Sequence, residues 1–148
     1  MKPSSSLSTA LKEQIRQIYA DLEARPLPRA CQLSGGCCRF KLTGRTPSVT
    51  RVEALYAAVG VRAAGRTKLQ PRADGACSCL GKDGRCTIYQ NRPFGCRTHF
   101  CEEAGGMYPR KHVADLIRRL EALDVSIGWR NGPRDFPEAL EDALEDWK

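Results

Sequence analysis

The sequence predicts an α-rich α+β fold in which three or four helices pack around a core of cysteine-bearing loops, with little sheet. Two observations lead to this prediction. Apolar residues recur at helical spacing near both ends of the chain and in one central segment. All eight cysteines, by contrast, lie between residues 31 and 101. The loops of residues 61–108 have no continuous apolar period, so they need another source of order.

The first two predicted helices cover residues 7–24 and about 51–59. Arg25-Pro26 ends the apolar period of the first helix. Thr50 and Glu53 form the capping-box signature Thr-x-x-Glu at the start of the second helix, and Gly60 is expected to end it. The expected buried faces comprise Leu7, Leu11, Ile15, Ile18, Tyr19 and Leu22, and then Val52, Leu55, Tyr56 and Val59.

Two more helices are predicted after the cysteines, over about 109–123 and 137–147. Early acidic residues in the last helix complement the helix dipole. Sheet is limited to two weak candidates, residues 39–43 and 68–70. The expected apolar stripes comprise Val113, Leu116, Ile117, Leu120 and Leu123, and then Leu140, Leu144 and Trp147.

Length and composition favour a single cysteine-cluster domain over residues 1–148, because 148 residues can bury a core of their own. Residues 1–6 precede a charged amphipathic segment rather than the apolar run of a signal peptide. No stretch of about eighteen apolar residues is present to form a transmembrane helix. We therefore expect a cytoplasmic protein that does not bind membranes.

This expected location decides how the cysteines are interpreted. A reducing cytosol keeps thiols from forming stable disulfides. Eight thiols in one such chain are therefore expected to bind a thiophilic metal. Dense thiolates select zinc, iron–sulfur clusters or copper(I), and a zinc ion or a cluster takes four of them. Eight cysteines could serve two sites, or one site plus structural and redox thiols. The candidate ligands are Cys31, Cys37, Cys38, Cys77, Cys79, Cys86, Cys96 and Cys101.

Local sequence suggests how some of these cysteines meet. Asp83-Gly84 predicts a tight hairpin that brings Cys77 or Cys79 beside Cys86. Cys77 and Cys79 would share a face if they lie on a strand. Asn91 could cap a short helical turn in which Cys96 faces back toward the hairpin. The adjacent Cys37 and Cys38 point to opposite sides of an extended backbone, which favours a cluster or paired metals over a single zinc ion.

A family resemblance enters with one specific run of residues. Cys77-x-x-Leu80 is followed by Cys86-Thr-Ile-Tyr89-x-x-Arg92-Pro93-x-x-Cys96-Arg97-x-x-Phe100, and Gly35-x-Cys37-Cys38-Arg39 lies upstream. This pattern resembles the YkgJ-type cysteine-cluster family, named for C-x-x-C-x-x-C-C and described as zinc- or iron-chelating. The resemblance covers about half of the chain. It implies metal or iron–sulfur binding through Cys31, Cys37, Cys38, Cys77, Cys86 and Cys96, with Cys101. A related region in flagellin lysine methylases makes an accessory role in a modifying enzyme conceivable.

The chain departs from the family pattern at two positions. Ser34 stands where the name motif has its second cysteine, and Cys79 stands where the family usually has an apolar residue. Either Cys79 replaces the lost ligand, or one site is incomplete or has a non-cysteine ligand. The His99 imidazole could supply that ligand, whereas a hydrogen-bonding role is the plainer alternative. His112 is expected on the surface.

Charge and motif content leave three functions open. Residues 25–134 carry 20 Lys and Arg against 8 Asp and Glu, whereas residues 135–148 carry six acids against one lysine. Such a basic body could bind nucleic acid weakly and without specificity, or an unknown protein partner, or simply balance thiolate charge. No Ser-His-Asp set, phosphate loop or dinucleotide turn identifies a catalytic residue. The chain is therefore predicted to be a zinc, iron or iron–sulfur protein. The alternatives are a redox or accessory enzyme, or a zinc-stabilised basic interaction module.

Overall fold

The computed structural model describes residues 7–25, 47–70, 72–73, 75–83, 85–98 and 110–146. These residues are mainly helical and form one two-stranded sheet, which confirms the α-rich α+β prediction. The elements in chain order are α1 (Thr9–Glu23), β1 (Ser48–Val49), α3 (Arg51–Ala63), the 3₁₀ turn η2 (Tyr89–Asn91), α4 (Phe94–Thr98), the 3₁₀ turn η4 (Arg110–His112), α5 (Ala114–Ser126), β2 (Arg134–Asp135) and α6 (Phe136–Glu145). No helix in these ranges is long and apolar enough to cross a membrane.

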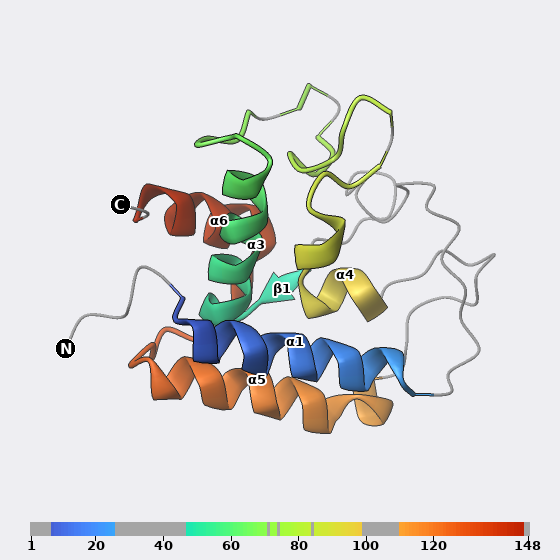
Figure 1. Cartoon of the computed structure of the whole chain (residues 1–148), viewed down its shortest axis with the longest axis vertical. Helices are drawn as coiled ribbons and strands as arrows, with labels where there is room; N and C mark the ends of the chain where they lie inside the picture. The colour runs from blue at the N-terminus through green and yellow to red at the C-terminus, as the bar shows by residue number, and fades with distance from the viewer. Residues whose placement is uncertain are drawn as a thin grey trace.

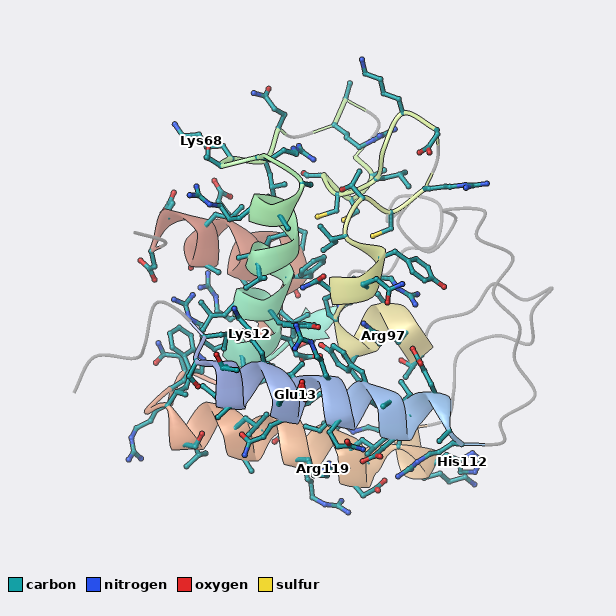
Figure 2. All side chains as sticks on the ribbon, in the orientation of Figure 1. Lys12, Glu13, Lys68, Arg97, His112 and Arg119 are labelled. Carbon is teal, nitrogen blue, oxygen red and sulfur yellow. The ribbon has the colours of Figure 1, made fainter. Side chains whose placement is uncertain are left out.

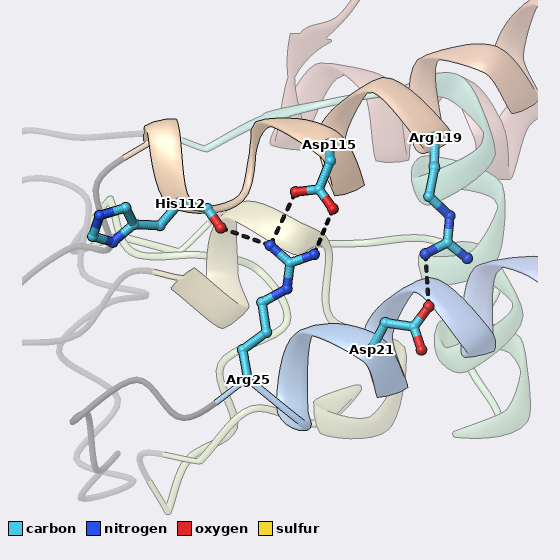
Figure 3. A network of polar contacts seen from close by, with 5 residues as sticks. All are labelled: Asp21, Arg25, His112, Asp115 and Arg119. Atoms are coloured by element: carbon cyan, nitrogen blue, oxygen red, sulfur yellow. Dashed lines mark hydrogen bonds and ion pairs between the residues drawn. The ribbon is translucent and has the colours of Figure 1, made fainter.

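Helices α1 and α5 lie side by side and run in opposite directions (Figure 1). The Ser8 hydroxyl caps α1 by accepting from the Leu11 amide at 3.1 Å. Polar contacts between the two helices line their outer edge (Figure 3). The Arg25 guanidinium donates to both carboxylate oxygens of Asp115, at 2.9 and 2.5 Å, and to the His112 carbonyl at 2.6 Å. Arg25 and His112 therefore lie together although they are far apart in the sequence.

Helix α3 is the centre of the core and packs against α1, α5 and α6. It is apolar on most of its circumference, as expected for a buried helix. The predicted capping box is present, because the Thr50 hydroxyl accepts from the Glu53 amide while the Glu53 carboxylate accepts from the Thr50 amide. The Asp124 carboxylate of α5 accepts from the Arg51 and Val52 amides at 2.9 and 2.8 Å, so a second acid covers the same helix start.

The predicted end of α3 at Gly60 is wrong. Gly60 lies inside the helix, and a Cβ atom there would be only 2.9 Å from Cβ of Asn91. The helix ends instead at Ala63, and Gly65, which follows the C-cap residue Ala64, has a φ of 83°. The Gly65 amide donates to the Arg62 carbonyl, and the Arg66 amide donates to the Val61 carbonyl. This is a Schellman motif, and it places Arg66 directly at the end of a rigid helix.

The small sheet joins the start of α3 to the start of α6. Ser48 pairs with Asp135 and Val49 with Arg134 in an antiparallel register, and the Phe136 amide donates to the Pro47 carbonyl at 2.9 Å. Such two-residue strands are too short for sequence patterns to reveal. The weak strand candidate at 68–70 is irregular in the structure, and the candidate at 39–43 lies outside the described residues.

The later helices follow the predictions with shifted ends. Helix α5 begins at Ala114 after η4, and its buried residues are Leu116, Leu120 and Asp124. Helix α6 has Pro137 in its first turn and buries Leu140 and Leu144. Trp147, expected on the same face, lies outside the described residues.

Candidate metal centre

The predicted hairpin exists and brings cysteines together at the end of the molecule to which α3 points (Figure 1). Leu80 and Cys86 are antiparallel partners, joined by hydrogen bonds from the Gly81 amide to the Arg85 carbonyl (2.7 Å) and from the Thr87 amide to the Cys79 carbonyl (2.8 Å). Leu80 and Cys86 thus form a non-hydrogen-bonded pair, the kind in which facing side chains come closest. The residue facing Cys86 is Leu80, and Cys79, one position earlier, is close enough to Cys86 for the charge of Cys86 to raise the pKa of the Cys79 thiol.

Cys77 and Cys79 meet in a way that the sequence did not suggest. The Leu80 amide donates to the Cys77 carbonyl at 3.0 Å, so Cys77–Leu80 is a turn and not a strand. The shared-face argument for a strand therefore does not apply. The turn nevertheless brings the two side chains within hydrogen-bonding reach of each other. Cys77 and Cys79 are both buried, and Cys86 is partly buried against the core.

The surroundings of the Cys79 thiol strongly oppose its ionisation. The hydrogen bond with Cys77 raises the pKa of the Cys79 thiol far above its usual range, and burial and the charges of Cys77 and Cys86 raise it further. Arg66 alone among the main causes lowers it. Because like charges at short range oppose one another in a buried site, these thiols stay protonated unless a positive charge compensates them.

Backbone carbonyls around Cys79 are held by side chains. The Arg66 guanidinium donates to the Ser78 carbonyl at 3.4 Å, and the Arg72 guanidinium donates to the Leu80 carbonyl at 2.9 Å. The Thr87 hydroxyl donates to the Cys79 carbonyl at 2.6 Å, in addition to the bond from its amide. The turn is therefore fixed by residues on both sides of it.

Cys96 lies on α4, whose start is held by a side chain of α3. The buried Glu53 carboxylate accepts from the Phe94 amide at the start of α4 at 2.7 Å and from the Tyr19 hydroxyl at 3.4 Å. The Asn91 side chain donates to the Tyr56 carbonyl at 2.9 Å, rather than capping α4 as predicted. Cys96 is close enough to Tyr19 for its charge to raise the Tyr19 pKa, although burial is the main cause of that shift. That Cys96 faces the hairpin stays a prediction.

The Tyr-x-x-Arg-Pro-x-x-Cys-Arg residues build this turn-and-helix unit. The Arg92 guanidinium stacks on the Tyr89 ring at 3.8 Å and donates to the Tyr89 carbonyl at 2.9 Å. Arg97 donates to the Arg92 and Gln90 carbonyls, forms an ion pair with Glu23 at 3.2 Å and stacks on the Tyr19 ring at 4.0 Å. Its side chain is only 7% exposed (Figure 2 labels it), so Arg97 joins the nearby acid Glu23 and is no solvated surface arginine.

The remaining predicted ligands cannot be placed. Cys31, Cys37, Cys38 and Cys101 lie outside the described residues, as do Ser34 and His99. Within the described ranges, no three His, Cys, Asp or Glu side chains have an arrangement that could hold a metal ion on their own. His112 is exposed as expected, although it lies in η4 and not in the long helix.

Sequence reasoning missed three residues that shape the centre. Glu53 was assigned only to a cap, and Arg66 and Arg72 were assigned to a basic loop without a period. The available signal was the concentration of arginines just before Cys77, a place where carbonyls of a cysteine turn need donors. Their particular partners depend on the hairpin, which no local pattern specifies.

Comparison with known proteins identifies the cysteine-bearing part of the chain. Residues 30–114, more than half of the sequence, match the family model "CxxCxxCC: Putative zinc- or iron-chelating domain". This segment contains all eight cysteines, the hairpin and α4. No protein with a curated description and no solved structure matches the chain.

Proposed function

Because the chain belongs to the CxxCxxCC family of zinc- or iron-chelating domains, we propose that its cysteines form one or two thiolate metal centres. The observation that carries this proposal is the meeting of Cys77, Cys79 and Cys86 in one hairpin inside the family segment. The bound species is a zinc ion, an iron ion or an iron–sulfur cluster. The proposed ligands are drawn from Cys31, Cys37, Cys38, Cys77, Cys79, Cys86, Cys96 and Cys101.

The donor set favours soft, thiophilic metals. Thiolate sulfurs select zinc and iron–sulfur clusters over hard cations such as Mg²⁺ or Ca²⁺, which take oxygen ligands. The three cysteines of the hairpin supply fewer than the four ligands that zinc or a cluster takes. We therefore propose that the first cysteine segment (residues 31–38), α4 or Cys101 completes the coordination. Closed four-sulfur coordination would favour a structural or electron-transfer role, and an open position would favour catalysis.

A second candidate, a zinc-stabilised interaction module, is favoured by charge near the hairpin. Lys68, Lys82 and Arg85 are exposed there, with Asp83 as the acid among them in the described residues. Such a surface would attract an acidic protein or, weakly and with strong salt dependence, nucleic acid. Either function fits a reducing compartment such as the cytoplasm, where thiolates stay available to metal.

Metal analysis of the protein purified without oxygen tests the proposal directly. We expect bound zinc or iron, and a brown colour if a cluster is present. Removing the metal with a chelator should lower the melting temperature markedly, since metal binding and folding of the cysteine loops are coupled. Protein that carries neither metal after anaerobic purification, and melts at the same temperature with and without chelator, would refute the proposal.

The ligand role of Cys79 can be tested separately. If Cys79 compensates for Ser34, Cys79→Ser should lose metal while Ser34→Ala keeps it. A structure of the metal-bound protein should then show the Cys79 sulfur within about 2.5 Å of the metal, close to ordinary zinc–thiolate distances. Full metal content in Cys79→Ser would show instead that Cys79 is a packing thiol and that the coordination has a gap at Ser34.

A further inference from the structure

Every backbone carbonyl of the Cys77–Leu80 turn accepts a hydrogen bond. The Cys77 carbonyl accepts from the Leu80 amide, and the Cys79 carbonyl accepts from Thr87. The carbonyls of Ser78 and Leu80 alternate with these along the chain and accept from guanidinium groups instead. Because Leu80 is in a non-hydrogen-bonded pair with Cys86, its carbonyl points away from the partner strand, and there it accepts from Arg72.

Both arginines precede the hairpin in the chain, and a backbone hydrogen bond orders the segment at each of them. Arg66 follows Gly65 in the Schellman motif that ends α3, and α3 is the most buried helix described. Arg72 lies in a turn closed by a hydrogen bond of 3.0 Å from the Gly75 amide to its own carbonyl. The Arg66 guanidinium therefore connects the cysteine turn to the end of α3, and the Arg72 guanidinium connects it to the turn that precedes it.

Arginine is well suited to such a position for two reasons. Its guanidinium stays charged at any pH at which the protein folds, and it is weakly hydrated enough to be partly buried. A centre with three or four thiolates carries net negative charge even after it binds a divalent cation, so a nearby permanent cation stabilises the loaded form. A hydrogen bond to a flanking carbonyl also limits the rotation of the turn that carries the sulfurs.

We infer that Arg66 and Arg72 are positioning residues of the metal centre: by binding the carbonyls of Ser78 and Leu80 they hold Cys77 and Cys79 in the geometry that receives the metal. This inference rests on the proposed function and adds that residues outside the cysteine pattern set metal affinity. It assigns to the basic loop before Cys77 a role that the charge of the chain alone does not indicate.

The test measures metal binding in variants of the full-length chain. Zn²⁺ affinity is determined by competition with a chromophoric chelator, and Co²⁺ is used as a coloured probe of ligand geometry. Arg66→Gln and Arg72→Gln should each weaken Zn²⁺ binding by about ten- to a hundred-fold, the usual cost of losing a partner that supports a metal ligand. The Co²⁺ spectrum should change as well, because the sulfur geometry relaxes.

Two further variants separate positioning from general effects. Lys68→Gln removes the same charge from an exposed side chain in the same segment, and it should bind both metals as wild type does. Arg72→Lys keeps the charge but replaces the planar guanidinium with a compact ammonium group, so its affinity should lie between those of wild type and Arg72→Gln. Far-UV circular dichroism of the metal-free variants should match that of wild type, and loss of helix in Arg72→Gln would overturn the positioning role in favour of a folding role.

The outcomes distinguish this inference from the proposed function. Wild type that binds metal while Arg66→Gln and Arg72→Gln match Lys68→Gln in affinity and spectrum would refute the inference alone. Wild type that binds neither Zn²⁺ nor Co²⁺ would refute the proposed function and the inference together.

Discussion

Gly60→Ala is the substitution for which the structure and helix propensity make opposite predictions. In the interior of an ordinary helix, replacing glycine with alanine stabilises by about 1 kcal/mol. Gly60 has helical neighbours on both sides, so propensity alone predicts a more stable protein. The new Cβ, however, would lie 2.9 Å from Cβ and 3.0 Å from Cγ of Asn91. The Asn91 Cβ atom belongs to the base of its side chain, so it can retreat only if η2 moves.

The magnitude follows from what η2 would give up. Overpacking of this kind costs about 1–3 kcal/mol. Displacing Asn91 also weakens the 2.9 Å hydrogen bond from its side chain to the Tyr56 carbonyl, which contributes about 1 kcal/mol. Subtracting the gain in helix propensity, Gly60→Ala should lower the free energy of unfolding by about 1–3 kcal/mol.

Urea unfolding of the metal-loaded protein, at one fixed protein and metal concentration, measures this change. Asn91→Gly provides the matched background. In Asn91→Gly the opposing Cβ is absent, so Gly60→Ala should become neutral or stabilising. The two substitutions should therefore be coupled, with a sign reversal that helix propensity alone cannot give. Stabilisation by Gly60→Ala in the wild-type background would refute the reasoning, because Asn91 would then have room to move.

Two further substitutions concern carboxylates. Glu53→Gln should destabilise the protein by about 1–3 kcal/mol, since one amide oxygen cannot accept from both Thr50 and Phe94. Because burial raises the Glu53 pKa above its ordinary 4.5, wild-type stability should also fall as pH rises through the interval above 4.5. Urea titrations in which Glu53→Gln keeps this pH dependence would contradict the assignment. Asp115 differs, because Arg25 lowers its pKa from 3.8 to about 2, so its contribution is present above pH 3.8 and is lost as pH falls toward 2. Asp115→Asn should flatten thermal stability over that acid range by a small amount, because the pair is exposed to solvent and salt; an unchanged slope would show that the Figure 3 contact does not persist in solution.

The sequence was most informative where local chemistry decides structure. The capping box at Thr50 and Glu53, the apolar period of α1 and the turn at Asp83 each depend on residues within a few positions of one another. The end of α3 was mispredicted for the opposite reason. Both Gly60 and Gly65 could stop a helix, and only the contact with Asn91, about thirty positions away, explains why Gly60 is glycine.

Pairs that are distant in sequence escaped prediction altogether. Asp124 covers the start of α3 and Arg25 joins η4 and α5, but nothing near either residue specifies its partner. The same holds for β1 and β2, whose two-residue strands have no detectable alternation. These contacts depend on how helices pack, and packing is decided by the whole apolar surface at once.

The cysteine turn shows how a correct grouping can follow from a wrong geometry. Cys77 and Cys79 were expected to share the face of a strand, yet they meet because Cys77–Leu80 is a turn. A turn needs donors for the carbonyls that a strand would pair with its neighbour, and here Arg66 and Arg72 supply them. In this chain two arginines of the basic loop before Cys77 therefore supply donors to the C-x-C turn.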